Sequence, residues 1–182
     1  MCSSDLDLDG VMALAEDLMC TIAADVLRDC AAELDTIDSI RSEAEEHKQL
    51  LPRREALAKV QKPFPRLHHA EAIARLRAAG SDIGDGDDLG GDDETILTQQ
   101  FDRPIFVHRY PAEVKAFYMK RDPADAVRSL SVDMLAPEGY GEVVGGGQRE
   151  DDLETLRAAI AKHQLPEEPY GWYLDLRRYG SV

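Results

Sequence analysis

The sequence is poor in aromatic residues, cysteine and long apolar runs, and each shortage excludes a class of protein. Aromatic residues make up 6% of the 182 residues, while the hydrophobic share is 43%, which fits one globular domain. The three cysteines, Cys2, Cys20 and Cys30, are too few and too irregularly spaced for a disulfide framework or a zinc site. No apolar run approaches the roughly 20 residues of a membrane span, and the start lacks the basic and apolar regions of a signal peptide. We therefore expect a cytoplasmic protein without a membrane partner.

Basic residues are also scarce. The chain has 21 Lys and Arg against 36 Asp and Glu, a formal net charge of -15, which argues against a nucleic-acid-binding surface spread over the chain. Seven acids occupy the thirteen positions from Asp82 to Glu94. A solvated loop leading into a helix explains this run better than a metal-binding loop, because the regular every-second-residue acids of a calcium loop are missing. The adjacent His68 and His69 lack a third ligand at a familiar spacing, so we expect ordinary histidines.

Hydrophobic periodicity predicts helices on both sides of a strand-rich region. Residues 35–62 are charged and weakly periodic, and we interpret them as a peripheral helical excursion that Pro52 interrupts. Asp92 or Asp93 can cap the helix that begins at Glu94, and Asp151 or Asp152 can cap the helix that follows the strands. Gly80 and Gly180 stop two of the helices. The predicted core helices are 8–34, 69–79, 94–101, 151–163 and 170–179.

Apolar alternation predicts strands between residues 103 and 149. The predicted strands are 104–108, 114–120, 128–135 and 140–149. Short turns join them, so they should pair antiparallel with the helices grouped outside. The predicted fold class is therefore α+β, with an antiparallel sheet flanked by helices.

The last two predicted strands place two acids close together. Asp133 and Glu142 flank a turn of sequence Pro-Glu-Gly-Tyr-Gly, and across such a hairpin they can share one face. Paired carboxylates repel unless a cation or a shared proton relieves them, and a hard divalent ion with phosphate oxygens is one solution. The alternative is that both acids are simply solvated.

Three successive glycines, Gly145, Gly146 and Gly147, follow in the same strand. Such a run is costly unless a bulge or a close backbone approach requires it. A bulge there would return Arg149 to the face of Glu142. The alternative for Arg149 is a salt bridge with an acid at the start of the next helix, Glu150 or Asp151.

Several motifs occur in an order that resembles a known family. They are Phe64-Pro-Arg, Gly86-Asp-Asp-Leu-Gly-Gly with Glu94-Thr-Ile-Leu, His108-Arg-Tyr-Pro, Lys115-Ala-Phe-Tyr-Met, Leu135-Ala-Pro-Glu-Gly-Tyr-Gly-Glu-Val-Val-Gly-Gly-Gly-Gln-Arg149 and Trp172-Tyr-Leu-Asp-Leu-Arg-Arg-Tyr-Gly-Ser-Val182. Together they are similar to the asparaginyl-tRNA synthetases, which are class II aminoacyl-tRNA synthetases. The resemblance covers nearly everything from about Asp7 onward.

The resemblance implies an enzyme that activates asparagine with ATP and magnesium, transfers it to tRNA and usually works as a homodimer. On the matched positions, Asp133 and Glu142 would hold magnesium and the ATP phosphates, and Arg149 would bind the amino acid. The backbone of Gly145, Gly146 and Gly147 would form the floor beneath it. No residue is expected to act as a nucleophile, since the protein's task is positioning and charge neutralisation.

The sequence also departs from the family pattern. The family's anticodon-binding domain and its first and second motifs precede the segment that matches Asp7, and its third motif should follow Val182. We therefore expect residues 7–182 to be a partial catalytic domain with little or no turnover alone, and residues 1–6 to be a non-native stretch. Asp85 stands where the family usually has tryptophan.

Two other functions stay open. One is a class II relative that uses aspartate, either an aspartyl-tRNA synthetase or an asparagine-forming paralogue, although Gly-Gly-Gly-Gln-Arg-Glu and Lys-Ala-Phe-Tyr-Met favour asparagine. The other is a non-catalytic binding module derived from the fold. The presence of Asp133, Glu142 and Arg149 argues against the second.

Overall fold

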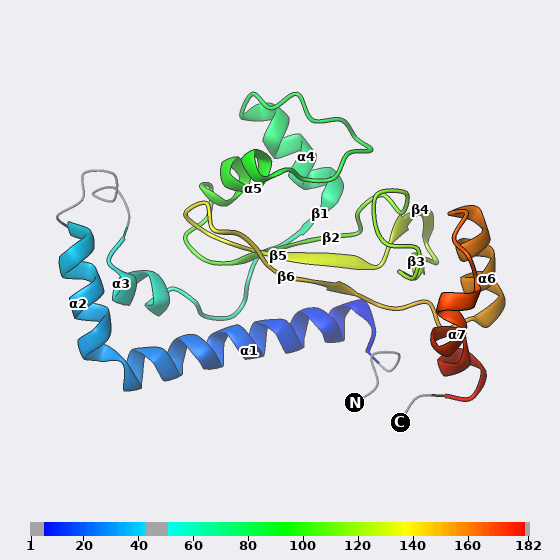
Figure 1. Ribbon diagram of the computed structural model, residues 1–182. Coiled ribbons are helices and arrows are strands. Elements are labelled where there is room, and N and C mark those ends of the chain that lie inside the picture. Colours follow the sequence, from blue (N-terminus) through cyan, green and yellow to red (C-terminus); the bar gives the residue numbers. More distant parts are fainter. Residues whose placement is uncertain (1–5, 43–50, 181–182) are drawn as a thin grey trace.

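A computed structural model describes residues 6–42 and 51–180 (Figure 1). The predicted excursion therefore lies partly outside the described residues, at 43–50, as does most of the stretch predicted to be non-native. The elements in chain order are α1 (Leu8–Asp29), α2 (Ala31–Ser42), α3 (Arg53–Ala58), β1 (Arg66–His68), α4 (His69–Ala78), α5 (Gly91–Thr98), β2 (Ile105–His108), β3 (Arg121–Asp122), β4 (Asp125–Ser129), β5 (Ser131–Ala136), β6 (Gly141–Gly147), α6 (Leu153–Lys162), a short 3-10 turn η2 (Glu168–Tyr170) and α7 (Gly171–Arg178).

A four-stranded sheet in the order β1-β2-β5-β6 forms the centre of the molecule. The pairs β2–β5 and β5–β6 are antiparallel, while β1 and β2 run parallel. Helices α4 and α5 lie on one side of this sheet and α1 runs along the other, with α6 and α7 beyond one end (Figure 1). The predicted α+β fold with helices flanking a mainly antiparallel sheet is confirmed.

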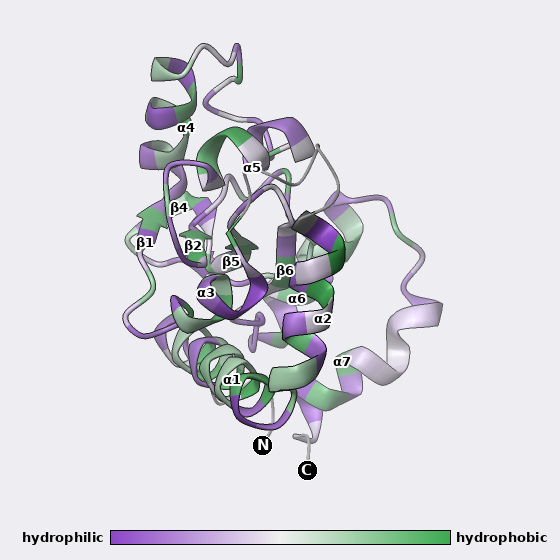
Figure 2. Ribbon diagram, turned by 90° about the vertical axis from the view of Figure 1, so that its left-hand side faces the viewer, coloured by the Kyte–Doolittle hydropathy of each residue, from purple (hydrophilic) through white to green (hydrophobic). Residues whose placement is uncertain are grey.

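Alternating side chains of the strands enter two separate cores. Ile105, Val107 and Leu135 pack with residues of α4 and α5 on one face, and Phe106 and Met134 pack with α1 on the other. Figure 2 shows these apolar strands in green between the helices. Burial of each side chain of this size stabilises the fold by about 1.5–3 kcal/mol relative to exposure. Turning β5 over would expose these side chains, so the alternation fixes which of its residues face each helical layer.

A third, smaller cluster joins the two C-terminal helices. Leu156 and Ile160 of α6 and Leu174 of α7 are its buried residues, and Phe117 and Tyr118 pack against it. The side chain of Asp152 accepts a hydrogen bond from Thr155 N at 2.7 Å and caps α6, as predicted. Gly180 has a positive φ of 84° just after α7, as its predicted role as a stop requires.

The single helix predicted over 8–34 is wrong in length. Helix α1 ends at Asp29, and Cys30 leaves helical geometry with φ -118° and ψ 31° before α2 begins. The reason is packing: α2 turns away from the axis of α1 (Figure 1) and brings Leu34 to 6% exposure. The apolar period continues across this turn, so periodicity alone cannot locate the break.

The strand predicted over 114–120 is also wrong. This segment consists of turns, with one isolated bridge from Met119 to Arg149. Its backbone bonds to the chain after β6, with Lys120 N donating to Gln148 O at 2.9 Å. The apolar residues that suggested alternation, Phe117 and Tyr118, pack instead against the third cluster.

The strand predicted over 128–135 is divided at Leu130. Residues up to Ser129 form β4, which pairs with β3 in a separate two-stranded sheet, and β5 begins at Ser131. Leu130 N donates to Lys120 O at 2.7 Å, so the chain changes partners at this residue. The strands predicted over 104–108 and 140–149 correspond to β2 and β6.

None of the helices within the described ranges is long and apolar enough to cross a lipid bilayer.

Candidate functional site: a carboxylate cluster over a glycine

Asp133 and Glu142 lie together on the face of the sheet that α4 and α5 cover. Asp133 pairs with Val107 on one side and Gly145 on the other, and it is 8% exposed. A Cβ added at Gly145 would lie 3.6 Å from Asp133 Oδ1 and would collide with Glu142 Oε1. Both predicted carboxylates therefore occupy the space that the missing side chain of Gly145 leaves free.

A β-bulge brings Glu142 to this face. Met134 pairs with Val144 and Leu135 pairs with Glu142, so Val143 is an extra residue without a partner on β5. In an unbroken ladder Glu142 would point to the face of α1, because side chains alternate along a strand. The bulge predicted at Gly145–Gly147 is thus wrong in position: it lies before the glycines and redirects Glu142 rather than Arg149.

Arg149 lies in an aromatic pocket beyond the end of β6. Its guanidinium carbon is 4.5 Å from the centroid of the Tyr118 ring, a cation–π arrangement. The pocket has a volume of about 410 Å³ and is lined by Phe117, Tyr118, Arg149, Tyr170, Trp172 and Tyr173.

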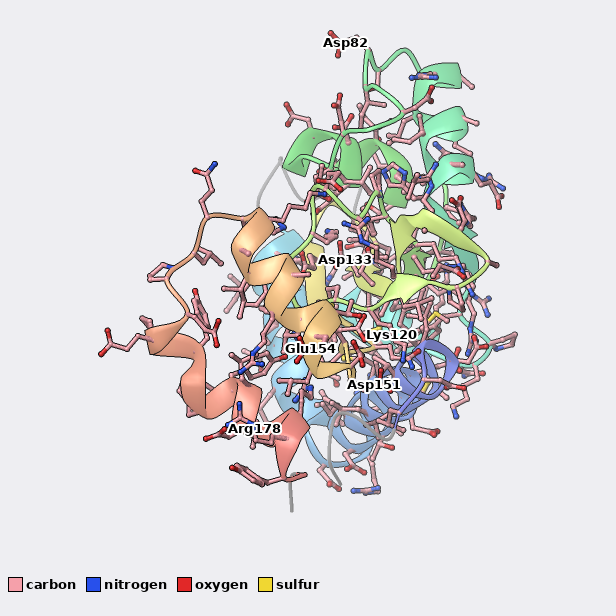
Figure 3. All side chains as sticks on the ribbon, turned by 90° about the vertical axis from the view of Figure 1, so that its right-hand side faces the viewer. Asp82, Lys120, Asp133, Asp151, Glu154 and Arg178 are labelled. Carbon is pink, nitrogen blue, oxygen red and sulfur yellow. The ribbon has the colours of Figure 1, made fainter. Side chains whose placement is uncertain are left out.

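The alternative prediction, a salt bridge from Arg149 to the next helix start, does not describe this structure. The Glu150 carboxylate accepts hydrogen bonds from the backbone N–H groups of Asp151 and Asp152 at 3.0 Å. Asp151 forms its ion pair with Lys120, and Figure 3 shows these two labelled side chains close together. Arg149 is therefore left facing the aromatic pocket.

Lys115 is part of the carboxylate cluster, although the sequence placed it on a strand. Its Nζ lies 2.7 Å from Asp133 Oδ2 and 2.9 Å from Asp88 Oδ1, and 3.8 Å from the centroid of the buried Tyr110 ring. Burial alone would lower the pKa of Lys115, but the hydrogen bonds and charges of Asp133 and Asp88 raise it. The ammonium group is therefore held charged. One signal was available in the sequence: Lys115 stands beside Phe117 and Tyr118 in a segment between two turns.

Glu94 in the first turn of α5 is another site residue that sequence reasoning missed, as is Asp88. Its Oε2 accepts a hydrogen bond from Glu142 N at 3.1 Å, so α5 is fastened to the hairpin. The pKa values of Glu142 and Glu94 are both raised, first by burial and also by the charge of Asp133. Four carboxylates, those of Asp88, Glu94, Asp133 and Glu142, thus surround the one ammonium group of Lys115, which leaves a net negative site that attracts cations.

The acids of this site are suited to a hard cation but do not form a complete cage for one. Within residues 6–42 and 51–180, no three His, Cys, Asp or Glu side chains are arranged to hold a metal ion. Magnesium is usually bound by one or two carboxylates together with waters and phosphate oxygens. The pair Asp133 and Glu142 fits that pattern in ligand chemistry.

The acidic loop between α4 and α5 is exposed at Asp82, Asp85, Asp87 and Asp88 and leads into α5, as predicted, and hydrogen bonds anchor it. Arg77 Nε donates to Ile83 O at 2.9 Å and Asp87 Oδ2 accepts from Gly84 N at 2.8 Å. Hydrophilic colours follow this loop in Figure 2, and Asp82 points outward in Figure 3. Asp85, at the position where tryptophan was expected, is exposed and pairs with Arg77.

The adjacent histidines have structural roles, as predicted. His69 is fully buried, and its Nε2 lies 2.9 Å from Asp87 O. Its Nδ1 lies 3.1 Å from Arg128 Nη1. Because a guanidinium can only donate, Nδ1 accepts and Nε2 carries the proton. The neutral ring therefore ties the acidic loop to β4.

Comparison with known proteins places this arrangement in a family. Residues 2–182 match the model of class II tRNA synthetases (D, K and N). An asparagine–tRNA ligase of Sorangium cellulosum is 50% identical over 188 residues, which cover 97% of this chain and 39% of the relative. The chain thus spans well under half the length of that relative.

Solved structures show the same likeness. The asparaginyl-tRNA synthetase from Pyrococcus horikoshii complexed with asparaginyl-adenylate superposes with a TM-score of 0.86 at 42% identity, over 97% of this chain and 38% of that one. An aspartyl-tRNA synthetase from Entamoeba histolytica gives a TM-score of 0.79 at 25% identity, over 97% of this chain and 37% of that one.

Proposed function

The chain belongs to the class II tRNA synthetases (D, K and N), and on that premise we propose that it forms the adenylate-forming site of an asparagine–tRNA ligase. The observation that carries the proposal is the pair Asp133 and Glu142 over the bare backbone of Gly145. The relative of known structure holds asparaginyl-adenylate, which is the product of such a site. Ligation to tRNA and assembly as a homodimer are part of this proposal as properties of the whole enzyme.

We assign Asp133 and Glu142 to magnesium and the ATP phosphates. The cluster carries more carboxylates than cations, and burial raises the pKa of Glu142, so a divalent cation would relieve the repulsion. Magnesium would neutralise phosphate charge when bound. These two side chains would hold it, with the phosphate oxygens completing its ligands.

We assign Arg149 and the glycine run to asparagine. Arg149 has only hydrogen-bond donors and so suits an amide oxygen, and its aromatic pocket of about 410 Å³ has room for a small amino acid. Gly145 presents backbone without a side chain on the face that carries Asp133 and Glu142, which lets a ligand approach this part of the glycine run closely.

The reaction would need positioning rather than a protein nucleophile. One oxygen of the asparagine carboxylate attacks the α-phosphorus of ATP, the bond to the β-phosphate oxygen breaks, and pyrophosphate leaves with the electron pair. Holding the reactants in line and neutralising the phosphate charge lowers the barrier. Asp133, Glu142 and Arg149 are suited to these tasks.

The test is ATP–pyrophosphate exchange with asparagine. We expect little or no exchange from the 182-residue chain alone. A chimera that carries these 182 residues in place of the matching segment of the Sorangium cellulosum relative should exchange with asparagine, and Asp133→Asn or Glu142→Gln in it should lower the rate at least about 100-fold. A chimera that folds and has no exchange with asparagine or aspartate would contradict the proposal and favour a non-catalytic module.

Aspartate is the second candidate substrate, because a guanidinium pairs with a carboxylate more strongly than with an amide and an aspartyl-tRNA synthetase is among the structural neighbours. The same chimera decides between them. Faster exchange with asparagine than with aspartate supports the ligase proposed here, and the reverse order replaces it with an aspartate-using enzyme.

A further inference from the structure

Lys115 links three separate parts of the site. It lies in the turns between β2 and β3, yet its ammonium group reaches Asp133 on β5 at 2.7 Å and Asp88 in the acidic loop at 2.9 Å. The Tyr110 ring, fully buried, supports it at 3.8 Å. Only 15% of the Lys115 side chain is exposed, so this is an interior contact rather than a surface ion pair.

The two oxygens of Asp133 have different surroundings. Oδ2 accepts from Lys115 Nζ, while Oδ1 points toward Gly145, beside the Glu142 carboxylate. A carboxylate bonded through one oxygen cannot rotate freely about its last torsion. Lys115 therefore fixes the plane of the Asp133 carboxylate, with one oxygen on Lys115 and the other beside Glu142.

The same ammonium group holds the acidic loop at a second point. His69 bonds to Asp87 O from the side of α4, and Lys115 bonds to the next residue, Asp88, from the side of the sheet. Asp85, three residues earlier, has its side chain 83% exposed. The part of the loop nearest the site is thus fastened from both sides.

We propose that Lys115 is a positioning residue for magnesium–ATP: it orients Asp133 so that one oxygen stays free beside Glu142, and through Asp88 it holds the acidic loop over the site. The orientation of Asp133 for magnesium–ATP rests on the proposed function, whereas the attachment of the acidic loop through Asp88 does not. Outer groups that orient a metal-binding carboxylate commonly change metal affinity 10- to 100-fold when they are removed.

The plain alternative is an ion pair that only stabilises the fold. Lys115 has two ion pairs, one with Asp88 (the loop arm) and one with Asp133 (the Asp133 arm). Removing them separately distinguishes the alternatives. Asp88→Asn removes the loop arm and leaves the Asp133 arm, whereas Lys115→Met removes both. Matched controls are Asp85→Asn, which removes an exposed loop carboxylate, and Lys120→Met, which breaks the exposed Lys120–Asp151 pair on the same segment.

Hydrogen–deuterium exchange of the 182-residue chain without ligands tests the loop arm. We expect the backbone amides of residues 82–90 to exchange about fivefold faster in Asp88→Asn and in Lys115→Met. Asp85→Asn and Lys120→Met should match the wild type. Unchanged exchange in Asp88→Asn, a mild change at a half-exposed residue, overturns the loop assignment even if Lys115→Met fails to fold.

Binding of Mn²⁺–ATP, followed by water-proton relaxation, tests the orientation of Asp133. The expected result is at least about tenfold weaker binding in Lys115→Met, with Lys120→Met near the wild type. Equal affinity in Lys115→Met and the wild type refutes the positioning role. A wild-type chain that binds no Mn²⁺–ATP at millimolar concentration instead counts against the proposed function, and the exchange result still decides the loop arm.

Discussion

Three histidines at the β1–β2 edge are held neutral by their surroundings. Burial lowers the pKa of His68, His69 and His108, and nearby arginines lower each further. The effect is largest at His108, whose pKa falls to about 4. A neutral ring is also what the His69 bond pattern requires, since its Nδ1 accepts from Arg128.

The lowered pKa values of these histidines predict that the folded state loses stability in acid. Because the pKa of His108 is lowered in the folded state, the unfolded chain binds the proton first as the pH falls below about 6.5. The free energy of unfolding should therefore be highest above that pH and should fall as the pH decreases toward 4. The loss attributable to His108 should be about 1–2 kcal/mol after allowance for solvent screening.

Urea unfolding of the wild type and of His108→Asn at pH 7 and pH 5 measures this effect. The variant should lose less stability between the two pH values than the wild type does. His163→Asn, which removes an exposed histidine after α6, serves as the matched control and should keep the wild-type dependence. Parallel pH profiles for the wild type and His108→Asn would contradict the assignment.

The three successive glycines of β6, Gly145, Gly146 and Gly147, should respond differently to alanine. At Gly146 an added Cβ would meet Val11 at 3.7 Å, an ordinary contact, so alanine should cost less than about 1 kcal/mol. At Gly147 it would lie 2.5 Å from Leu130 O with φ +156°, so alanine should cost about 2 kcal/mol or more. At Gly145 it would displace only the flexible Glu142 carboxylate.

Gly145→Ala should therefore leave stability within about 1 kcal/mol of the wild type and weaken Mn²⁺–ATP binding about tenfold. Urea unfolding and relaxation titrations of the three variants separate these effects. A larger loss of Mn²⁺–ATP binding in Gly146→Ala than in Gly145→Ala would contradict the placement of the metal site beside Gly145.

At the scale of elements, one arginine joins the hairpin tip to α3. Arg53 Nη2 lies 2.6 Å from Glu138 Oε2, with both side chains about 15% exposed, and its Nη1 donates to Tyr140 OH at 3.1 Å. Glu138 itself has a positive φ of 61° in the turn. This contact holds the tip of the hairpin that carries the site against the helical part of the chain.

Arg53→Met should lower the free energy of unfolding by about 2–3 kcal/mol, because it leaves the largely buried Glu138 carboxylate without its partner. Arg54→Met is the matched control: its pair with Asp35 is exposed, and its loss should cost less than about 1 kcal/mol. Urea unfolding of both variants gives the comparison. Equal losses would mean that the Arg53 contact adds nothing beyond a surface ion pair.

Elements with local signals could be predicted, and those defined by distant partners could not. Gly80 and Gly180 end helices through their own conformations, and Asp152 caps α6 through a bond three residues away. The break at Cys30 depends instead on where α2 packs, and the division at Leu130 depends on Lys120 across the sheet. Hydrophobic periodicity cannot reveal either change, because the apolar pattern continues across both positions.

The same distinction applies to the site. Asp133, Glu142 and the glycines share one hairpin, so short-range reasoning brought them together. Lys115 and Glu94 reach the hairpin from other elements, and the residue that bulges, Val143, carries no local mark of it. The roles assigned to Asp133, Glu142 and Arg149 stay predictions until the binding and exchange experiments are done.

At the scale of the molecule, the net charge of -15 should keep tRNA away from this chain alone. In the part of the chain that the structure describes, most Lys and Arg side chains are paired with acids, Lys120 and Arg53 among them. A gel-shift titration with tRNA at 50 mM salt should show no retarded band at micromolar protein. A clear shift that disappears at 200 mM salt would contradict this prediction and indicate a basic surface that binds tRNA phosphates.

The β-bulge at Val143 has a second consequence, which concerns association between chains. In the described sheet β6 is an edge strand, and a regular edge offers a row of free N–H and C=O groups to a strand of another molecule. Val143, 44% exposed, would be the apolar centre of such a contact. The extra residue breaks the repeat there, Glu142 adds a charge, and the glycines that follow provide no side chains for a partner strand to pack against. The irregularity that directs a carboxylate into the site thus also protects the open edge of the sheet from aggregation.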